Sequence, residues 1–281
     1  MTAAVETSTF QRRARRAPPT LVVGAFIVGT WIALALLAPW LTAYDPIAVD
    51  VTNTLKPMSG EHWLGTDSFG RDVFSRLLHG ARLDLQMAFF GVVGPLIIGT
   101  AIGLLAAYYG GVVDALLMRV LDVTVSFPYF VLVIAIVAVL EPGLRSYYIS
   151  LTLVNWVTYA RLMRSQVLVL KNAEFVLAAR TIGIRDRRIM LRHILPNAIA
   201  PSIVFVMTDA VLTIVLGSSL GFLGLGVQPP EPEWGVMIAE GQVYLKQAWW
   251  IAVFPGIAIS TLALGFSLAA DGMAKLLHAA Q

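Results

Sequence analysis

Residues able to carry covalent chemistry are few in this sequence, and they are widely scattered. The 281 residues include no cysteine, which excludes thiolate nucleophiles, disulfides and thiolate metal ligands. None of the four lysines follows a glycine, so the sequence lacks the phosphate-binding G-x-x-x-x-G-K-[ST] loop, and it contains no H-E-x-x-H. Its one G-x-S-x-G match, Gly217–Gly221, lies inside an apolar run and not at the strand-to-helix turn that a nucleophilic serine requires. The histidines are too dispersed to predict a metal site; they are His62, His79, His193 and His278. We therefore expect no catalytic residue, no metal and no cofactor bound by this chain.

The densest group of charged residues lies between Arg161 and Arg192 and contains eight of the twenty basic residues. Within it, Glu174–Ile182 predicts a short helix that ends at Gly183. One face of this helix has the spacing i, i+3, i+4, i+7; its members are Phe175, Ala178, Ala179 and Ile182. A second helical stretch, Asp186–Leu195, is expected to stop before Pro196.

An alanine-rich face on a basic loop suits docking into a groove of a partner protein. The same loop would suit an interfacial helix on anionic lipid equally well, because four arginines follow Gly183; they are Arg185, Arg187, Arg188 and Arg192. The residues alone leave both interpretations open.

Two further segments carry charge next to apolar residues. Arg71–Arg82 is typical of an amphipathic helix at a membrane surface, with Val73, Phe74, Leu77, Leu78 and Ala81 on its apolar face. Leu223–Ala248 is interrupted by glycines and prolines and carries Glu231, Glu233 and Glu240. We expect an external partner to contact Arg71, Asp72, Glu233 and Trp234. The alternatives are a helix that only orients the following span and loop charge that is simply solvated.

The elements that must position these residues are membrane spans. The chain is 58% hydrophobic and 13% charged, with a mean hydropathy of +0.77, whereas soluble domains are about 45–50% apolar and about 25% charged. This composition excludes a soluble globular protein and a disordered one. Segments close to the roughly 20 apolar residues that a spanning helix needs occur at 21–41, 85–108, 120–140, 147–163, 202–222 and 249–270. The sequence thus predicts an all-α polytopic membrane protein with six transmembrane helices.

Basic residues set the expected orientation. With the N-terminus inside, fourteen basic residues fall in inner segments and six in outer ones. This bias places both termini in the cytoplasm. It also accounts for the net charge of +3 without nucleic acid. Asp209 is then the one ionisable residue clearly within a span, and we expect it to line a path across the membrane or to pair with a companion chain.

Three parts of the chain are expected. Residues 1–20 form a basic cytoplasmic tail, and residues 21–84 form the first span with an external segment. Residues 85–281 form a core of five helices with the cytoplasmic loop 164–201.

Four separated motifs resemble one family of membrane proteins. Ala178-Ala179, Gly183, His193 and Pro196 have the spacing of the EAA loop of binding-protein-dependent ABC importer permeases. The stretches that resemble the "C"-type permeases of its dipeptide, oligopeptide and nickel branch are His62–Arg76, Leu220–Pro230 with Glu233-Trp234-Gly235, and Ala270-Asp271-Gly272. The likeness extends over about residues 20–275. One departure is Leu177, which occupies the place of the EAA glutamate, so that Glu174 would have to supply a carboxylate.

The resemblance implies the type I ABC importer permease fold and a coupling helix that docks on an ATPase. The docking residues would be Glu174, Phe175, Ala178, Ala179, Arg180, Gly183, His193 and Pro196. It further implies three kinds of protein partner: a homologous second permease in a heterodimer, two ATPase subunits or domains that use ATP and Mg, and an extracytoplasmic substrate-binding protein. It also implies contact with membrane lipid and a location in the inner membrane of a bacterial or archaeal cell. The implied cargo is a di- or oligopeptide, with a nickel complex or another peptide-like solute as the alternative. An ion-coupled secondary transporter is the alternative class, but it would require several midplane charges.

Overall fold

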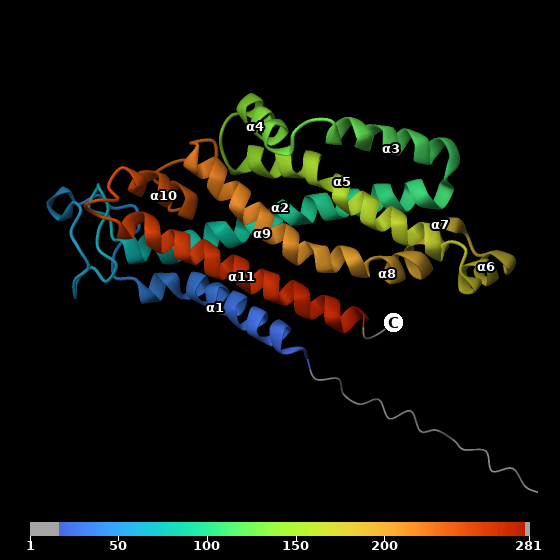
Figure 1. The fold of residues 1–281 in the computed structure, drawn as a ribbon, viewed down its shortest axis with the longest axis horizontal. Helices are drawn as coiled ribbons and strands as arrows, with labels where there is room; N and C mark the ends of the chain where they lie inside the picture. The colour runs from blue at the N-terminus through green and yellow to red at the C-terminus, as the bar shows by residue number, and fades with distance from the viewer. Residues whose placement is uncertain (1–16, 279–281) are drawn as a thin grey trace, which may run out of the picture.

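Long apolar runs form the longest helices of the protein in a computed structural model, which describes residues 17–278. α1 (Pro19–Leu41), α9 (Ala200–Phe222) and α11 (Trp250–His278) are each long and apolar enough to cross a membrane. They coincide with three predicted spans to within a few residues, apart from the extended C-terminal end of α11. Figure 1 shows α1 and α11 side by side along one edge of the molecule, with α9 on the other side of α11.

The second predicted span is part of a much longer helix, α2 (Val73–Tyr109), which has 37 residues. Asp72 begins it, because the Asp72 carboxylate accepts a hydrogen bond from the Ser75 N–H at 2.8 Å. The helix expected over Arg71–Arg82 is therefore present from Val73 onward, but it is not separate from the second span: these residues form the outer turns of α2. At about 1.5 Å per residue α2 exceeds the roughly 30 Å of a hydrocarbon core, so its charged outer turns extend beyond the core.

The third predicted span, 120–140, is broken into two helices. α3 (Gly111–Val125) and α4 (Tyr129–Leu140) meet at an angle of 88°. Pro128 directly precedes α4 and disfavours helical backbone at Phe127, which ends the first helix. Figure 1 shows α3 running along the bundle and α4 turned across it.

The fourth predicted span corresponds to α5 (Leu144–Leu170), which packs along α2 more extensively than any other pair of helices in the described residues. Glycines permit this approach: a Cβ at Gly99 or Gly103 would lie 2.3 Å from the carbonyl oxygen of Trp156 or Ala160. By length and composition, four helices of the described chain qualify as spans, or five if α3 and α4 count as one. Six spans and two cytoplasmic termini stay predictions.

Short elements occupy the two ends of the bundle. One end carries α6 (Glu174–Thr181), α7 (Asp186–Arg188), the π-helical segment η2 (Ile189–Ile194) and α8 (Leu195–Ala198). At the opposite end in Figure 1 lie α10 (Trp234–Gln242) and the segment 42–72, which includes η1 (Val51–Asn53). We call these the inner and outer ends, following the predicted orientation. Residues 17–278 contain no β-strand.

Two parts of the expected division of the chain can be compared with the structure. Its boundary at residue 84 falls inside α2, so the external segment continues into the core without a break. Most of the expected basic tail, including its four arginines, lies outside the described residues.

Candidate functional site

The short helix α6 has an inward and an outward face. Val176 and Ala179 are buried in one apolar cluster with residues from the inner ends of α2 and α5, among them Tyr108 and Val167. Because successive residues turn by about 100°, the face opposite this pair consists of Glu174, Leu177, Ala178 and Thr181, all of which are exposed. The predicted face was therefore wrong in one member: Ala179 packs inward, while Phe175, Ala178 and Ile182 are exposed.

The predicted stop at Gly183 is confirmed. Gly183 has φ +79°, which costs glycine little. Its N–H donates to the Arg180 carbonyl at 2.9 Å, and the Ile184 N–H donates to the Ala179 carbonyl at 3.1 Å. These two bonds form a Schellman motif. The motif fixes the direction in which the chain leaves α6.

Polar contacts attach this loop to the inner end of α2. The Tyr108 hydroxyl donates to Asp186 Oδ1 at 2.5 Å, and the Arg180 guanidinium lies 5.1 Å from the centre of the Tyr108 ring. Lys171 Nζ donates to the Ala107 carbonyl at 2.8 Å. We call the exposed face of α6 (Glu174, Leu177, Ala178 and Thr181) its tip. The chain is held to α2 both before α6, at Lys171, and after it, at Asp186.

The second helical stretch of the loop does not stop before Pro196, as the sequence predicted. It continues through Pro196 into α8, because a π-helical turn in η2 precedes the proline. His193 is half-buried in this turn, and its carbonyl accepts a hydrogen bond from Asn197 Nδ2 at 2.7 Å. Pro196 is exposed. The structure thus places His193 and Pro196 on the same loop as α6 but on a different helix.

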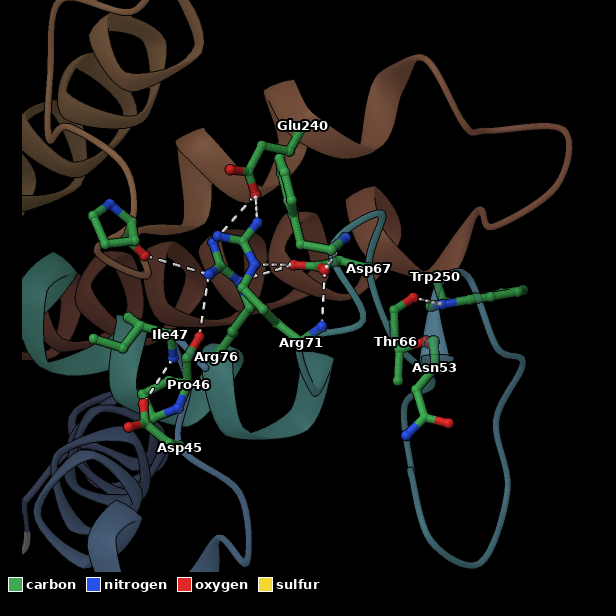
Figure 2. A network of polar contacts seen from close by, with 12 residues as sticks. Asp45, Pro46, Ile47, Asn53, Thr66, Asp67, Arg71, Arg76, Glu240 and Trp250 are labelled. Atoms are coloured by element: carbon green, nitrogen blue, oxygen red, sulfur yellow. Dashed lines mark hydrogen bonds and ion pairs between the residues drawn. The ribbon is translucent and has the colours of Figure 1, made fainter. Parts of the chain in front are cut away.

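The outer end is held by two arginines and two carboxylates (Figure 2). Arg71 donates to Asp67 Oδ2 at 2.6 Å and to Glu240 Oε2 at 2.7 Å. Arg76 donates to the same Glu240 oxygen at 3.2 Å and to the Pro46 carbonyl at 3.2 Å. Arg71 and Arg76 are only 4% and 1% exposed. The network joins the segment before α2, the first turn of α2 and α10.

The residues expected to contact an external partner are covered by the protein itself. Asp72 is buried beside His62, whose Nδ1 lies 2.9 Å from Asp72 Oδ1. Arg71 is buried in the network of Figure 2, and Glu233 and Trp234 have no exposed surface. In this conformation these four side chains cannot form the predicted contact. They order the outer end instead.

Glu233 begins α10 and lies next to a second buried carboxylate. Its side chain accepts hydrogen bonds from the N–H groups of Gly235 and Val236, both at 2.8 Å. Asp84, from α2, accepts from the Trp234 N–H at 3.3 Å, and Trp234 Nε1 donates to the Leu77 carbonyl at 3.0 Å. Burial raises the pKa of the Glu233 carboxyl. These contacts fix the start of α10 against α2.

Asp209 belongs to α9, and its side chain faces α5. Its carboxylate accepts a hydrogen bond from the Tyr159 hydroxyl at 2.8 Å and a longer one from Asn155 Nδ2 at 3.4 Å. At 3% exposure Asp209 is covered by its own chain. It therefore has partners inside this chain, both on α5.

Sequence reasoning missed the residues that hold these sites together. Tyr108 and Asp186 are 78 residues apart, and Arg71 and Glu240 are 169 apart, so no local pattern links them. The available signals were the acidic residue Glu233, since a carboxylate is stabilising at a helix N-terminus, and Pro128 as a break.

Comparison with known proteins places this arrangement in a family. The sequence pattern of the family described as "Binding-protein-dependent transport system inner membrane component" matches residues 99–280. The chain is 44% identical over 252 residues to the dipeptide transport system permease protein DppC of Alkalihalophilus pseudofirmus. The aligned residues cover 90% of this chain and 83% of that protein. It is 39% identical to the probable D,D-dipeptide transport system permease protein DdpC of Escherichia coli (92% and 87% covered) and to the glutathione transport system permease protein GsiD of Pectobacterium atrosepticum (94% and 88%).

A solved structure agrees in fold. An inward-facing structure of the MetNI methionine ABC transporter contains a chain that superposes with a TM-score of 0.58 at 16% identity, covering 73% of this chain and 96% of that one. This similarity shows the permease fold of a type I ABC importer. The protein is a multi-pass membrane permease and belongs to the family of inner membrane components of binding-protein-dependent transport systems.

Proposed function

We propose that this chain forms half of the translocation pathway of an ATP-driven importer for short peptides. Relatives at 39–44% identity are named as permeases for dipeptides, D,D-dipeptides and glutathione. All three names describe compounds with amide bonds and carboxylates. A di- or oligopeptide is therefore the cargo we favour over a nickel complex.

The observation that carries the proposal is the exposed tip of α6 on a loop that is packed against the bundle. Ala178 is exposed at the centre of this tip, while Val176 and Ala179 beneath it are buried against α2 and α5. A partner that pushed or pulled α6 would move these inner helix ends, because the interior packs densely and transmits displacement. The tip is thus suited to convert closure of a partner ATPase into movement of the spans.

We propose the remaining partners on the same basis. The chain would bind no cofactor itself, and two partner ATPase subunits or domains would use ATP and Mg. Glu174, at the start of α6, would offer them a carboxylate. A homologous second permease would complete the pathway as a heterodimer with six spans and cytoplasmic termini in each chain, in the inner membrane of a bacterium or archaeon.

A substrate-binding protein would dock at the outer end. Exposed apolar side chains there include Trp63 and Phe69, which are 61% and 50% exposed. We propose Trp63 and Phe69 as the contact surface in place of the four buried residues expected from the sequence.

Copurification tests the proposal. The tagged chain, produced with its partner subunits and extracted in mild detergent, should retain the ATPase. Ala178→Trp should abolish retention, because bulk at the exposed tip blocks docking without disturbing the buried face. Ala43→Trp makes the same change at an exposed position of the outer end and should retain the ATPase. Equal retention by both variants, or an active chain without any ATPase, would overturn the proposal.

The cargo is tested separately in liposomes that contain the whole complex and its binding protein. Uptake of a labelled dipeptide that requires ATP supports a peptide importer. Uptake of nickel chelate alone would place the complex in the nickel branch.

A further inference from the structure

A cavity opens where the third span is broken. It has a volume of about 320 Å³ and lies between the α3–α4 break and α5. Its lining includes Thr124 and Tyr129 from the two sides of the break and Asn155, Thr158 and Arg161 from α5. Asn155 is eleven residues from the outer end of α5, or about 16 Å along the helix. The cavity therefore begins at membrane depth.

Its walls combine apolar side chains (Val125, Phe127, Val154 and Val157) with polar groups that lipid would leave without hydrogen-bond partners. Thr158 and Arg161 are both exposed, and they follow Asn155 at a spacing that keeps all three near one side of α5. Non-helical backbone is tolerated at membrane depth where it lines a water-filled cavity. The break between α3 and α4 provides such backbone here, and Arg161, one of the basic residues assigned to the inner side, is the innermost α5 residue of the lining. α5 also falls short of the apolar content that marks the other long helices as spans.

The charge distribution of the cavity favours an anion. Arg161 has no ion-pair partner or side-chain hydrogen bond within residues 17–278. The N-terminus of α4, which carries a partial positive charge, begins at Tyr129 on the cavity wall. The nearby carboxylate of Asp209 is covered and faces the Tyr159 hydroxyl and Asn155. A guanidinium thus remains available in the cavity, next to amide and hydroxyl groups that can bind a peptide bond.

We infer that this cavity is a subsite of the translocation path that receives the carboxylate end of the transported peptide, with Arg161 as its cation and Asn155 and Thr158 as its neutral hydrogen-bonding groups. The inference rests on the proposed function as a permease. It assigns the path to the exposed face of α5, whereas Asp209 stands behind Asn155 and positions it. The second permease would face the open side of the cavity.

The absence of cysteine from the chain makes single-cysteine accessibility a direct test. Thr158→Cys would be made in the complete complex in liposomes and treated with two methanethiosulfonate reagents, the anionic sulfonatoethyl and the cationic trimethylammonium-ethyl compound. Thr30→Cys is the matched control, because Thr30 is also an exposed threonine in the middle of a membrane helix, α1. The complex without either cysteine gives the background of the partner subunits.

We expect Thr158→Cys to react with both reagents while Thr30→Cys does not, and saturating dipeptide to slow the reaction at Thr158→Cys. Adding Arg161→Gln should lower the ratio of anionic to cationic rates about fivefold, as expected for loss of one nearby charge in water. An unreactive Thr158→Cys would overturn the inference, since lipid or protein would then cover the cavity. A reactive cysteine with an unchanged ratio would overturn the anion subsite.

These readouts are independent of the copurification test. A complex that retains its ATPase but leaves Thr158→Cys unlabelled contradicts this inference and leaves the proposed function standing. A chain that fails to retain the ATPase contradicts the proposed function, and Thr158→Cys labelling still decides whether the cavity is open to water.

Discussion

The hydroxyl of Tyr108 donates a hydrogen bond of 2.5 Å to Asp186 and so joins the inner end of α2 to the helix that follows α6. The same tyrosine ring lies under Arg180, a residue of α6 itself. One side chain of a spanning helix therefore contacts both halves of the loop 164–201. Together with the packing of Val176 and Ala179, this contact connects α6 to a spanning helix.

Replacing Tyr108 by phenylalanine should weaken this connection. The change keeps the ring beneath Arg180 and removes one hydrogen bond, which is worth about 1 kcal/mol because Asp186 is exposed to water. We expect a small decrease in melting temperature and a larger decrease in peptide taken up per ATP hydrolysed. Tyr109→Phe is the control, because Tyr109 is adjacent and exposed. Unchanged coupling in Tyr108→Phe would contradict the role of the contact.

Replacing Glu240 by glutamine should destabilise the outer end. Glu240 is the shared acceptor of Arg71 and Arg76, and both guanidiniums are buried (Figure 2). Glutamine keeps an acceptor oxygen and Asp67 still faces both guanidiniums, so loss of this one charge should cost about 1–3 kcal/mol. The melting temperature of the purified complex should fall and should recover little on addition of salt, because buried charges are poorly screened. Glu231→Gln, at an exposed position of the same loop, should change nothing; an equal effect there would contradict the assignment.

The buried carboxylate of Glu233 should make stability depend on pH. Because burial raises its pKa in the folded protein, the folded state holds a proton at pH values where the unfolded chain has released it. Stability is then greatest below the ordinary glutamate pKa of about 4.5 and declines as the pH rises through the folded value. Thermal unfolding measured across this range should show the decline. Glu233→Gln should reduce the slope without abolishing it, because the neighbouring buried carboxylate of Asp84 remains. Glu231→Gln should leave the slope unchanged; a slope unchanged in Glu233→Gln would assign the titration to another group.

The pair formed by Tyr159 and Asp209 should be more sensitive to loss of the tyrosine than to loss of the charge. Tyr159→Phe leaves a buried carboxylate with only its long contact to Asn155, a cost of about 1–3 kcal/mol. Asp209→Asn keeps an acceptor for the hydroxyl and should cost less. Melting temperatures of the two variants test the order. Tyr148→Phe, at a half-buried tyrosine of the same helix, provides the control, and the reverse order would contradict the assignment.

The sequence predicted the fold where composition alone determines the element. α1 and α9 follow the apolar runs closely. The continuity of the Arg71–Arg82 helix with the second span was missed because Arg76, Arg82 and Asp84 lower the hydropathy of the outer turns of α2 without ending the helix. The break before α4 was missed because both halves of the span are apolar, although Pro128 marks the place.

The sequence identified which segments form the sites better than it identified which of their side chains are buried. Gly183 was identified correctly because its role is local to the backbone. Ala179 was placed on the wrong face because its burial depends on α2 and α5, which lie far away in the sequence. Arg71 was expected to be exposed for the same reason: its partner Glu240 approaches it only in the folded chain.

We propose that the exposed tip of α6 docks on the ATPase, and site-specific crosslinking would detect this contact. A benzoylphenylalanine at Ala178 would be photoactivated in the assembled complex, with the same residue at Leu36 on α1 as the control, since Leu36 is 65% exposed. We expect an adduct between the permease and the ATPase from position 178 and none from position 36. If an assembled complex that hydrolyses ATP gave no adduct from position 178, α6 would not be the docking helix.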